Sequence, residues 1–599
     1  MKLIPIFTVV CFLVVLPVLS SCTSNGDTVV EPKAYDSATL GRWYERYLRS
    51  EAEKLKIRGL GVALIDSLGQ DSYFCLGDAG KGRKVDEGSV FDIGSTSKLL
   101  MPIAVMKLVD QGRMELDAPV ARYVPEFTLK SPSGSSTAIT IRSLLTHESG
   151  LPSDILEGWE PEAPGGRAGT TGKEYRQIVG LLNRTKATRE PWMQNSYSNA
   201  AFSLLAVAVE RASGQDYAEF VRREILLPWG MTDSGFAYDG LDPAGIAQGF
   251  SKRKEMPVPY IRDLPAGLFC SSARDMARFA RGLLGDQAGA GKVLKPSSIM
   301  ELWKVQNGGV SFDLDFKIGL TFWRHPIASL GLESTVWHGG DLPPFHAAFC
   351  LDPVQGIGVF VAVNSGSLDS AALEPLLVQG MRRQLMIRTG RDPERPMQEG
   401  DSPVVSASLE FRNELCGIYQ MPSVGVCAVY QKGRDLVFKA PRASAIVVLH
   451  RDSTMSLKPL LLGIVPLDTE SARHVQMRFV HLDGLPILCM RRVGDSDEDF
   501  ASAHGEKLRP TTLTPAWRGR LGPWRQAGGK ASFALAYNRD SGILSANGGT
   551  MALKPINDGE AVTEGYGRNS GEWIEAGQDA EGPWLRYSGM ELRRTASAR

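Results

Sequence analysis

The chain contains 599 residues, of which 43% are hydrophobic and 22% are charged, and its formal net charge is +0. This length is more than one hydrophobic core can serve, so we expect two to four domains. The balanced charge excludes nucleic acid as an expected partner. The eight histidines show no metal-ligand spacing, so we expect neither a metal site nor another cofactor.

The N-terminal segment predicts a lipid anchor. An apolar run from Leu3 to Leu19 leads into two serines and Cys22, a pattern typical of the bacterial lipoprotein signal. We therefore expect residues 1–21 to be a signal peptide, Cys22 to be lipidated and residues 22–35 to be a polar spacer. Such an anchor tethers the protein to the cell envelope, facing the periplasm, and analogy favours the outer membrane. The alternative is a retained membrane span, which the short run and its prolines disfavour.

Hydrophobic periodicity predicts the first folded elements. An amphipathic helix is expected over 36–54. Residues 59–66 and 71–76 alternate around a turn at Gly69, which predicts a hairpin.

Ser95 and Lys98 are the first candidates for chemistry. They stand three residues apart, where a strand-like run meets the helical apolar pattern of residues 99–114. Both should therefore lie on one face at a helix N-terminus, where unpaired N–H groups favour negative charge. The lysine can act as a base for the serine only if burial or a neighbour lowers its pKa. Pro102 should kink the helix beyond Lys98.

Tyr197 and Asn199 open a second apolar-periodic helix, which runs to Gly214. Beside Lys98, the tyrosine could share a proton with the lysine, each lowering the effective pKa of the other. Alternatively, its hydroxyl only caps a buried helix. Upstream, we expect a short helix over 141–147. The Gly- and Pro-rich stretch 158–172 is either a flap over a site or a plain surface loop.

His338, Gly339 and Gly340 precede two strand-like runs, 345–351 and 356–363. Glycines on a strand allow close backbone approach, which a substrate lying antiparallel along a sheet edge requires. Neighbouring N–H groups could then polarise a substrate carbonyl. A helix over 368–386 and a linker over 391–407 follow.

Five stretches in this order resemble the serine β-lactamase-related family. That family includes class C β-lactamases, penicillin-binding-protein-like D,D-carboxypeptidases, D-aminopeptidases and carboxylesterases. The stretches are Ser95-x-x-Lys98, Leu144-Leu145-Thr146-His147-Glu148-Ser149-Gly150-Leu151, Tyr197-x-Asn199, Pro228-Trp229-Gly230-Met231 and His338-x-Gly340. The similarity covers residues 36 to 389, so a hydrolase domain is expected over 36–390.

The resemblance implies an α+β fold of the β-lactamase/transpeptidase type, in which helices flank an antiparallel sheet of N- and C-terminal strands. It implies Ser95 as the acylated nucleophile, with Lys98 and Tyr197 as the proton-transfer pair. Asn199 would orient a substrate amide, and the backbone N–H groups of Ser95 and Asp341 would form the oxyanion hole. His147 would support a helix end.

Two departures from the family pattern bear on the substrate. The sequence His338-Gly339-Gly340 stands where carboxylate-recognising members often have Lys-Thr-Gly, so two carboxylate-binding groups are missing. Asp341 stands where the family usually has glycine, and an acid at the rim would repel anions and could hold a substrate ammonium. Both departures favour neutral or cationic substrates over carboxylates.

The C-terminal third contains an internal repeat. The matching stretches are 415–419 with 521–524, 454–459 with 550–555, and 490–492 with 592–594. Short alternating runs predict antiparallel barrels or sandwiches over 408–495 and 516–595, with a linker over 496–515. The arrangement resembles D-aminopeptidases, whose two trailing barrels flank the site. The sequence leaves open whether the units form two barrels or halves of one, and whether Cys416, Cys427 and Cys489 form a disulfide.

Together these features predict a membrane-tethered serine hydrolase that forms an acyl-enzyme on Ser95. It would cleave amide or ester bonds in small-molecule or peptide substrates, as D-aminopeptidases and esterases do. One alternative is a β-lactamase or a D,D-carboxypeptidase acting on cell-wall peptides. Another, of a different class, is a binding or sensory protein that uses the fold without turnover. The oligomeric state is left open.

Overall fold

The computed structural model describes residues 34–594 with several internal gaps. The gaps are residues 70, 130–131, 133–137, 158–170, 238–239, 242–245, 252–253, 257–258, 286–292, 367, 394–401, 422–423, 442, 462–464, 467–474, 493–502 and 527–531. The lipoprotein signal, Cys22, most of the spacer and most of the expected flap therefore lie outside the described residues. Among the described residues, no helix is both long and apolar enough to span a membrane.

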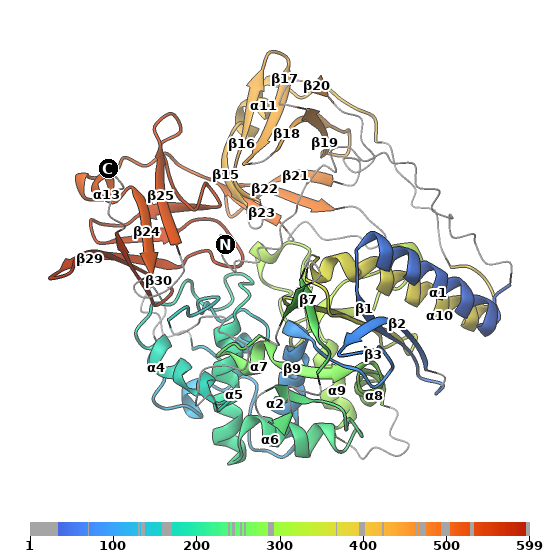
Figure 1. The fold of residues 1–599 in the computed structure, drawn as a ribbon. Helices are drawn as coiled ribbons and strands as arrows, with labels where there is room; N and C mark the ends of the chain where they lie inside the picture. Colours follow the sequence, from blue (N-terminus) through green and yellow to red (C-terminus); the bar gives the residue numbers. More distant parts are fainter. Residues whose placement is uncertain are drawn as a thin grey trace.

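An eight-stranded antiparallel sheet forms the centre of the N-terminal domain (Figure 1). In spatial order its strands are β10 (Lys317–Ile318), β11 (Trp323–Arg324), β12 (Val336–Leu342), β13 (Phe345–Asp352), β14 (Ile357–Val363), β1 (Gly59–Asp66), β2 (Ser72–Gly80) and β3 (Arg83–Lys84). β1 pairs with β14 from Leu60↔Val363 to Asp66↔Ile357. The sheet thus joins N- and C-terminal strands, as expected, and the predicted hairpin is confirmed.

Helices cover both faces of this sheet. α1 (Ser37–Lys54) and α10 (Glu374–Thr389) lie side by side on one face (Figure 1), and α8 (Ala273–Leu283) packs on the other. The Asp36 side chain caps α1 by accepting a hydrogen bond from the Thr39 N–H at 2.9 Å, so this helix begins where the sequence predicts. The helix expected over 368–386 is divided into η8 (Ser370–Leu373) and α10.

The remaining elements of the domain form the helical region inserted between β3 and β10. Its helices are α2 (Leu100–Asp110), α3 (Ile141–Leu145), α4 (Ile178–Leu182), α5 (Asn199–Ser213), α6 (Tyr217–Val221), α7 (Leu264–Gly267) and α9 (Pro296–Trp303), with short turns η1 (Gly94–Leu99), η2 (Val120–Arg122), η3 (Glu174–Gln177), η4 (Arg222–Leu226) and η6 (Ser311–Asp313). A further turn, η7 (Ala328–Leu330), lies between β11 and β12. Its strands are β4 (Val90–Asp92), β5 (Gly235–Ala237), β6 (Gly240–Leu241), β7 (Gly249–Ser251), β8 (Lys254–Met256) and β9 (Phe269–Ser272).

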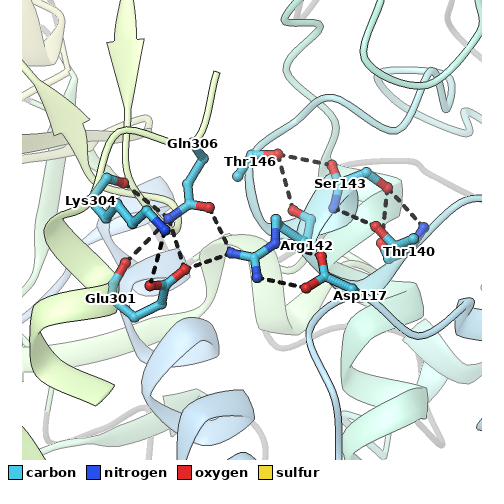
Figure 2. Close-up of polar contacts among 8 residues, drawn as sticks. All are labelled: Asp117, Thr140, Arg142, Ser143, Thr146, Glu301, Lys304 and Gln306. Atoms are coloured by element: carbon cyan, nitrogen blue, oxygen red, sulfur yellow. Dashed lines mark hydrogen bonds and ion pairs between the residues drawn. The ribbon is translucent and has the colours of Figure 1, made fainter. Parts of the chain in front are cut away.

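Polar contacts hold α3 in place within this region (Figure 2). Thr140 and Ser143 form a reciprocal capping box at its N-terminus, which satisfies N–H groups that lack a partner inside the helix. The Arg142 guanidinium donates to Asp117, Glu301 and Gln306, each at 2.7 Å. These contacts fix the N-terminal end of α3 and tie it to Glu301 of α9.

Two closed antiparallel barrels of eight strands follow the N-terminal domain (Figure 1). The first barrel consists of β15 (Gly417–Met421), β16 (Gly425–Lys432), β17 (Asp435–Ala440), β18 (Ala443–Leu449), β19 (Thr454–Leu461), β21 (Val475–Leu482), β22 (Leu485–Arg492) and β23 (Ala503–Lys507), with β20 (Val465–Pro466) beside β19 and α11 (Leu409–Leu415) before it. The second consists of β24 (Gly522–Gln526), β25 (Ser532–Asn538), β26 (Ile543–Ala546), β27 (Met551–Pro555), β28 (Glu560–Thr563), β29 (Trp573–Asp579), β30 (Gly582–Tyr587) and β31 (Met590–Arg594), preceded by α13 (Pro515–Gly519).

The structure corrects the expected linker over 496–515. β23 lies within that stretch and pairs with both β15 and β22, so the first barrel extends to Lys507. Its sequence, Ala-His-Gly-Glu-Lys, carries no apolar alternation. It becomes a strand because β15 and β22 leave unpaired backbone groups between them. The described cysteines, Cys416, Cys427 and Cys489 among them, are all free.

Candidate active site

Ser95 lies in η1, a turn of 3-10 helix that precedes α2. Gly94 has φ +52°, and its N–H donates to the Asp92 carboxylate at 2.8 Å. A Cβ on Gly94 would lie 2.5 Å from the Asp341 backbone nitrogen, so both the turn and the close approach of β12 require glycine. Asp92 is a site residue that the sequence did not single out. It is fully buried beneath the nucleophile turn, and burial raises its pKa to about 8.

Pro102 lies in the first turn of α2, where the N–H groups have no partner within the helix and a proline is tolerated. The backbone changes from 3-10 to α-helical geometry at Leu100.

The Lys98 side chain is fully buried beside the serine. Its Nζ lies 3.1 Å from Ser95 Oγ and 2.7 Å from the Ala266 carbonyl oxygen in α7. Burial, and next the positive charge of Arg568, hold the pKa of Lys98 well below its ordinary value. A neutral amine has two protons and one lone pair. It can donate to Ala266 and still accept the proton of the Ser95 hydroxyl.

Tyr197 also reaches Ser95, since the two side chains form a hydrogen bond. Lys98 Nζ lies 4.8 Å from the centroid of the tyrosine ring. Burial raises the pKa of Tyr197, and the hydrogen bond to Ser95 opposes this only in part. The expectation that the pair lower each other's pKa is therefore wrong for the tyrosine, and the lowered pKa of Lys98 comes from burial and Arg568 rather than from Tyr197. The cap of α5 is provided by Ser198, whose side chain accepts from the Ala201 N–H.

Two neutral histidines flank the tyrosine. The His147 ring centroid lies 4.3 Å from that of Tyr197, and the His338 centroid lies 6.4 Å from it. Burial lowers the pKa of His338 to about 3 and that of His147 well below its ordinary value, and Lys98 adds to both effects when it is protonated. His147 Nδ1 accepts the N–H of Ser198 at 3.0 Å. His147 thus contacts a catalytic candidate as well as the end of α3.

The residues of β12 alternate between two environments, as strand geometry requires. His338 and Gly340 face the nucleophile turn, and a Cβ on Gly340 would lie 1.9 Å from the Ile93 carbonyl oxygen. Glycine is therefore needed here because the protein's own backbone approaches, and the expectation of a close substrate contact at this Cα is corrected. Gly339 and Asp341 face η8, where a Cβ on Gly339 would meet Ser370 Oγ at 2.7 Å.

The Asp341 carboxylate points away from the catalytic face. It accepts the Ser370 N–H at 2.7 Å and the Ser370 hydroxyl at 2.6 Å, and it lies 2.6 Å from His346 Nδ1. The expectation that this acid holds a substrate ammonium at the rim is therefore wrong, because its side chain belongs to the opposite face of the strand. Its backbone nitrogen, by contrast, lies beside Gly94 next to Ser95.

Asn199 is held by a contact that the sequence did not predict. Its Nδ2 donates to Asp154 Oδ1 at 2.6 Å, and Asp154 Oδ2 accepts from the Arg568 guanidinium at 2.8 Å. Arg568 comes from the loop between β28 and β29, and its guanidinium carbon lies 5.4 Å from the Tyr197 ring centroid. Sequence reasoning missed both residues. A single arginine among glycines and a single aspartate after Pro152 show no pattern that would have revealed them.

Comparison with known proteins identifies the family of the N-terminal domain. A family model described as Beta-lactamase matches residues 45–379, which is more than half of the chain. Esterase EstB of Burkholderia gladioli is 32% identical over 239 residues, covering 38% of this chain and 60% of EstB. Protein flp of Staphylococcus aureus (strain NCTC 8325 / PS 47) is 23% identical over 316 residues, covering 52% of this chain and 59% of flp.

This chain therefore matches about three fifths of the length of these two relatives. A crystal structure of SurE aligns with a TM-score of 0.55 at 22% identity, covering 79% of this chain and 99% of SurE. At that identity the likeness concerns the fold alone. The match over residues 45–379 shows that the chain belongs to the β-lactamase family, whose members are serine hydrolases.

Proposed function

We propose that the protein cleaves amide or ester bonds through an acyl-enzyme on Ser95. The observation that carries the proposal is the convergence of a serine hydroxyl, a buried amine of lowered pKa and a protonated phenol. Lys98 Nζ lies 3.1 Å from Ser95 Oγ, and Tyr197 hydrogen-bonds to the same hydroxyl. A nucleophile with a base in hydrogen-bond reach is what covalent acyl transfer requires.

In the first step, the Ser95 proton moves to Lys98 Nζ while Ser95 Oγ bonds to the substrate carbonyl carbon. The oxyanion that forms accepts hydrogen bonds from the backbone N–H groups of Ser95 and Asp341. Collapse of this intermediate expels the amine or alcohol, which takes the proton back from Lys98, directly or through the Tyr197 hydroxyl. Water then attacks the ester on Ser95, with Lys98 again as the base, and releases the acid.

The proposed substrates carry an uncharged group next to His338. This ring is buried and neutral, with a pKa of about 3, so it supplies no cation for a carboxylate. Asp341 no longer favours a cationic group over a neutral one, because its carboxylate points away. The 32% identity with an esterase makes esters the first substrates to try. β-Lactams and C-terminal D-Ala peptides stay as the alternative.

The test is a substrate panel of p-nitrophenyl esters, D-amino-acid p-nitroanilides and nitrocefin. Ser95→Ala should lower kcat/KM by about 10³-fold or more on every substrate that the wild type cleaves. Ser89→Ala is the matched control, since this half-buried serine bonds to Asp86 and should keep full activity. Equal activity of the wild type and Ser95→Ala would remove the nucleophile assignment.

A fluorophosphonate identifies the modified residue by mass spectrometry. Labelling at Ser95 without turnover on any substrate would favour the binding or sensory alternative.

We also propose that Cys22 carries a lipid and tethers the protein to the bacterial envelope. The sequence pattern before Cys22 supports this. Metabolic labelling with radioactive palmitate should mark the wild type and not Cys22→Ser. Release of the unmutated protein into the soluble fraction would contradict the tether.

A further inference from the structure

A loop of the second barrel enters the catalytic centre. The loop, residues 564–572, connects β28 to β29. The Asn569 N–H donates to Ser153 Oγ at 2.9 Å, and the Ser153 N–H donates to the buried Glu572 carboxyl at 3.1 Å. Ser196, next to Tyr197, donates to the Gly567 carbonyl at 3.2 Å. The loop is therefore fixed to the segments that precede both Asp154 and Tyr197.

This anchoring places an ion pair beside the reacting groups. Arg568 and Asp154 are 2.8 Å apart, with side chains 41% and 15% exposed. The guanidinium lies over the Tyr197 ring, and the second Asp154 oxygen accepts from Asn199. The pair therefore links the second barrel to two residues of the Tyr197-x-Asn199 motif.

Several polar, charged or titratable groups face Lys98. They are Ser95 from η1, His147 after α3, Asp154, Tyr197 before α5, Asp263 and His338 from the elements around it, and Arg568 from the second barrel. Arg568 lowers the pKa of Lys98, whereas Asp154 and Asp263 raise it. Asp263 is itself paired with Arg262 at 3.2 Å. Lys98 is fully buried, whereas the Arg568 side chain is 41% exposed, so solvent screens part of the effect of this charge on Lys98.

We propose that the Arg568–Asp154 ion pair is a positioning element of the active site, which balances the protonation of Lys98 and holds Asn199 in place. The inference rests on the proposed role of Ser95 and Lys98. It gives the second barrel an influence on the reaction, since the positive charge of the pair, Arg568, comes from that barrel. Neither residue is proposed to react with substrate.

The test uses the pH dependence of Ser95 acylation by a fluorophosphonate, measured on the full chain. The rate should fall on the acid side as Lys98 becomes protonated. Arg568→Met removes the positive charge, so this acid limb should move to higher pH, by about half a pH unit or more. Asp154→Asn removes the negative charge, so the limb should move to lower pH. The double variant should lie between the two.

Two further variants separate charge from structure. Arg568→Lys keeps the charge and should leave the limb at the wild-type pH even if the rate falls. Arg593→Met breaks an ion pair elsewhere on the same barrel, where Arg593 lies 2.7 Å from Asp579, and should change neither limb nor rate. Stoichiometric labelling of each variant on the plateau at high pH shows that it is folded.

Opposite shifts for Arg568→Met and Asp154→Asn would support the inference. Shifts in the same direction, or unchanged limbs in both variants, would overturn it while leaving Ser95 as the nucleophile. A wild type that is never labelled at Ser95 would remove the proposed function itself, and this inference with it.

Discussion

The two C-terminal barrels have the same eight-stranded antiparallel architecture and meet the rest of the molecule in different ways. The first barrel contacts the second through Gln420, whose side chain accepts the Ala552 N–H at 2.7 Å and donates to the Thr550 carbonyl at 3.2 Å. Its Ile487 and Cys489 pack with Phe312 of the catalytic domain and with Tyr566. The second barrel instead sends Arg568 to within 5.4 Å of the Tyr197 ring centroid.

This difference shows that the barrel fold alone does not determine whether a barrel contributes residues to the candidate active site. The strands of both barrels bury their own cores, which are separate clusters. The contribution of the second barrel comes from one loop, 564–572, which lies on the catalytic domain at Ser153 and Ser196. Loops carry function because a rigid scaffold holds their ends. Four predictions, from the largest expected effect to the smallest, test this contrast.

The largest effect is expected from reversing the charge that the second barrel contributes. Arg568→Glu should lower kcat/KM about 100-fold, because it repels Asp154, frees Asn199 and favours the protonated form of Lys98. The matched variant in the first barrel is Arg434→Glu, in the exposed turn between β16 and β17. That variant should stay within about threefold of the wild type. Equal losses in both would erase the contrast between the barrels.

A smaller effect is expected from displacing the loop without changing charge. Gly571 has φ +73°, and a Cβ there would lie 2.7 Å from the Thr188 carbonyl oxygen of the catalytic domain. Gly571→Ala should lower kcat/KM about tenfold and cost about 2–3 kcal/mol of stability. Gly433→Ala is the control in the first barrel, since it has φ +62° and nothing within 4 Å.

Gly433→Ala should cost about 1 kcal/mol from backbone strain alone and leave kcat/KM unchanged. Urea unfolding and steady-state kinetics of both variants provide the measurements. An unchanged kcat/KM in Gly571→Ala would mean that the placement of the loop is not important for catalysis.

The third prediction concerns the Gln420 hydrogen bonds between the two barrels. The Gln420 side chain is buried and bonds to two backbone groups of the second barrel. Gln420→Ala should cost about 2 kcal/mol of stability, because it leaves those groups unpaired. It should change kcat/KM by less than about threefold, since the loop remains anchored to Ser153 and Ser196. A loss of activity larger than the loss of stability explains would give the first barrel a direct role.

The smallest effect is a pH dependence of stability from the second barrel. Glu572 is buried at its contact with Ser153, and burial raises its pKa above the ordinary value. Its stabilising contribution is therefore complete below the unfolded-state pKa and is lost as pH rises through the folded-state pKa.

Glu572→Gln should remove this dependence. As pH rises from about 4.5, the wild type should lose up to about 1.4 kcal/mol per pH unit relative to the variant. Urea unfolding at several pH values measures the difference. Parallel stability curves for the two proteins would show that Glu572 does not keep its proton in the folded state.

Much of the local structure could be predicted from sequence. The periodicity and Asp36 cap of α1, the hairpin of β1 and β2, and the start of α5 all depend on residues within a few positions. The candidate nucleophile, lysine and tyrosine could be selected because their motifs occur in order. Their convergence at one site agrees with that selection.

The face of β12 to which the Asp341 side chain points could also have been predicted from the sequence, but the prediction was wrong. Residues two apart on a strand share a face, so Asp341 belongs with Trp337 and Gly339, away from His338 and Gly340. The place of Arg568 in the site could not be predicted from the sequence, because its contact with Asp154 joins residues 414 positions apart. A strand as polar as β23 is likewise decided by its neighbours.

The sequence by itself determined the order of helices and strands in the catalytic domain and the chemical groups available for catalysis, because periodicity and turn residues act over short stretches of chain. Only the tertiary structure decided that burial lowers the pKa of Lys98, that Asp341 turns away and that Arg568 lies beside Tyr197. Burial and the distance between charges depend on segments that meet only after folding.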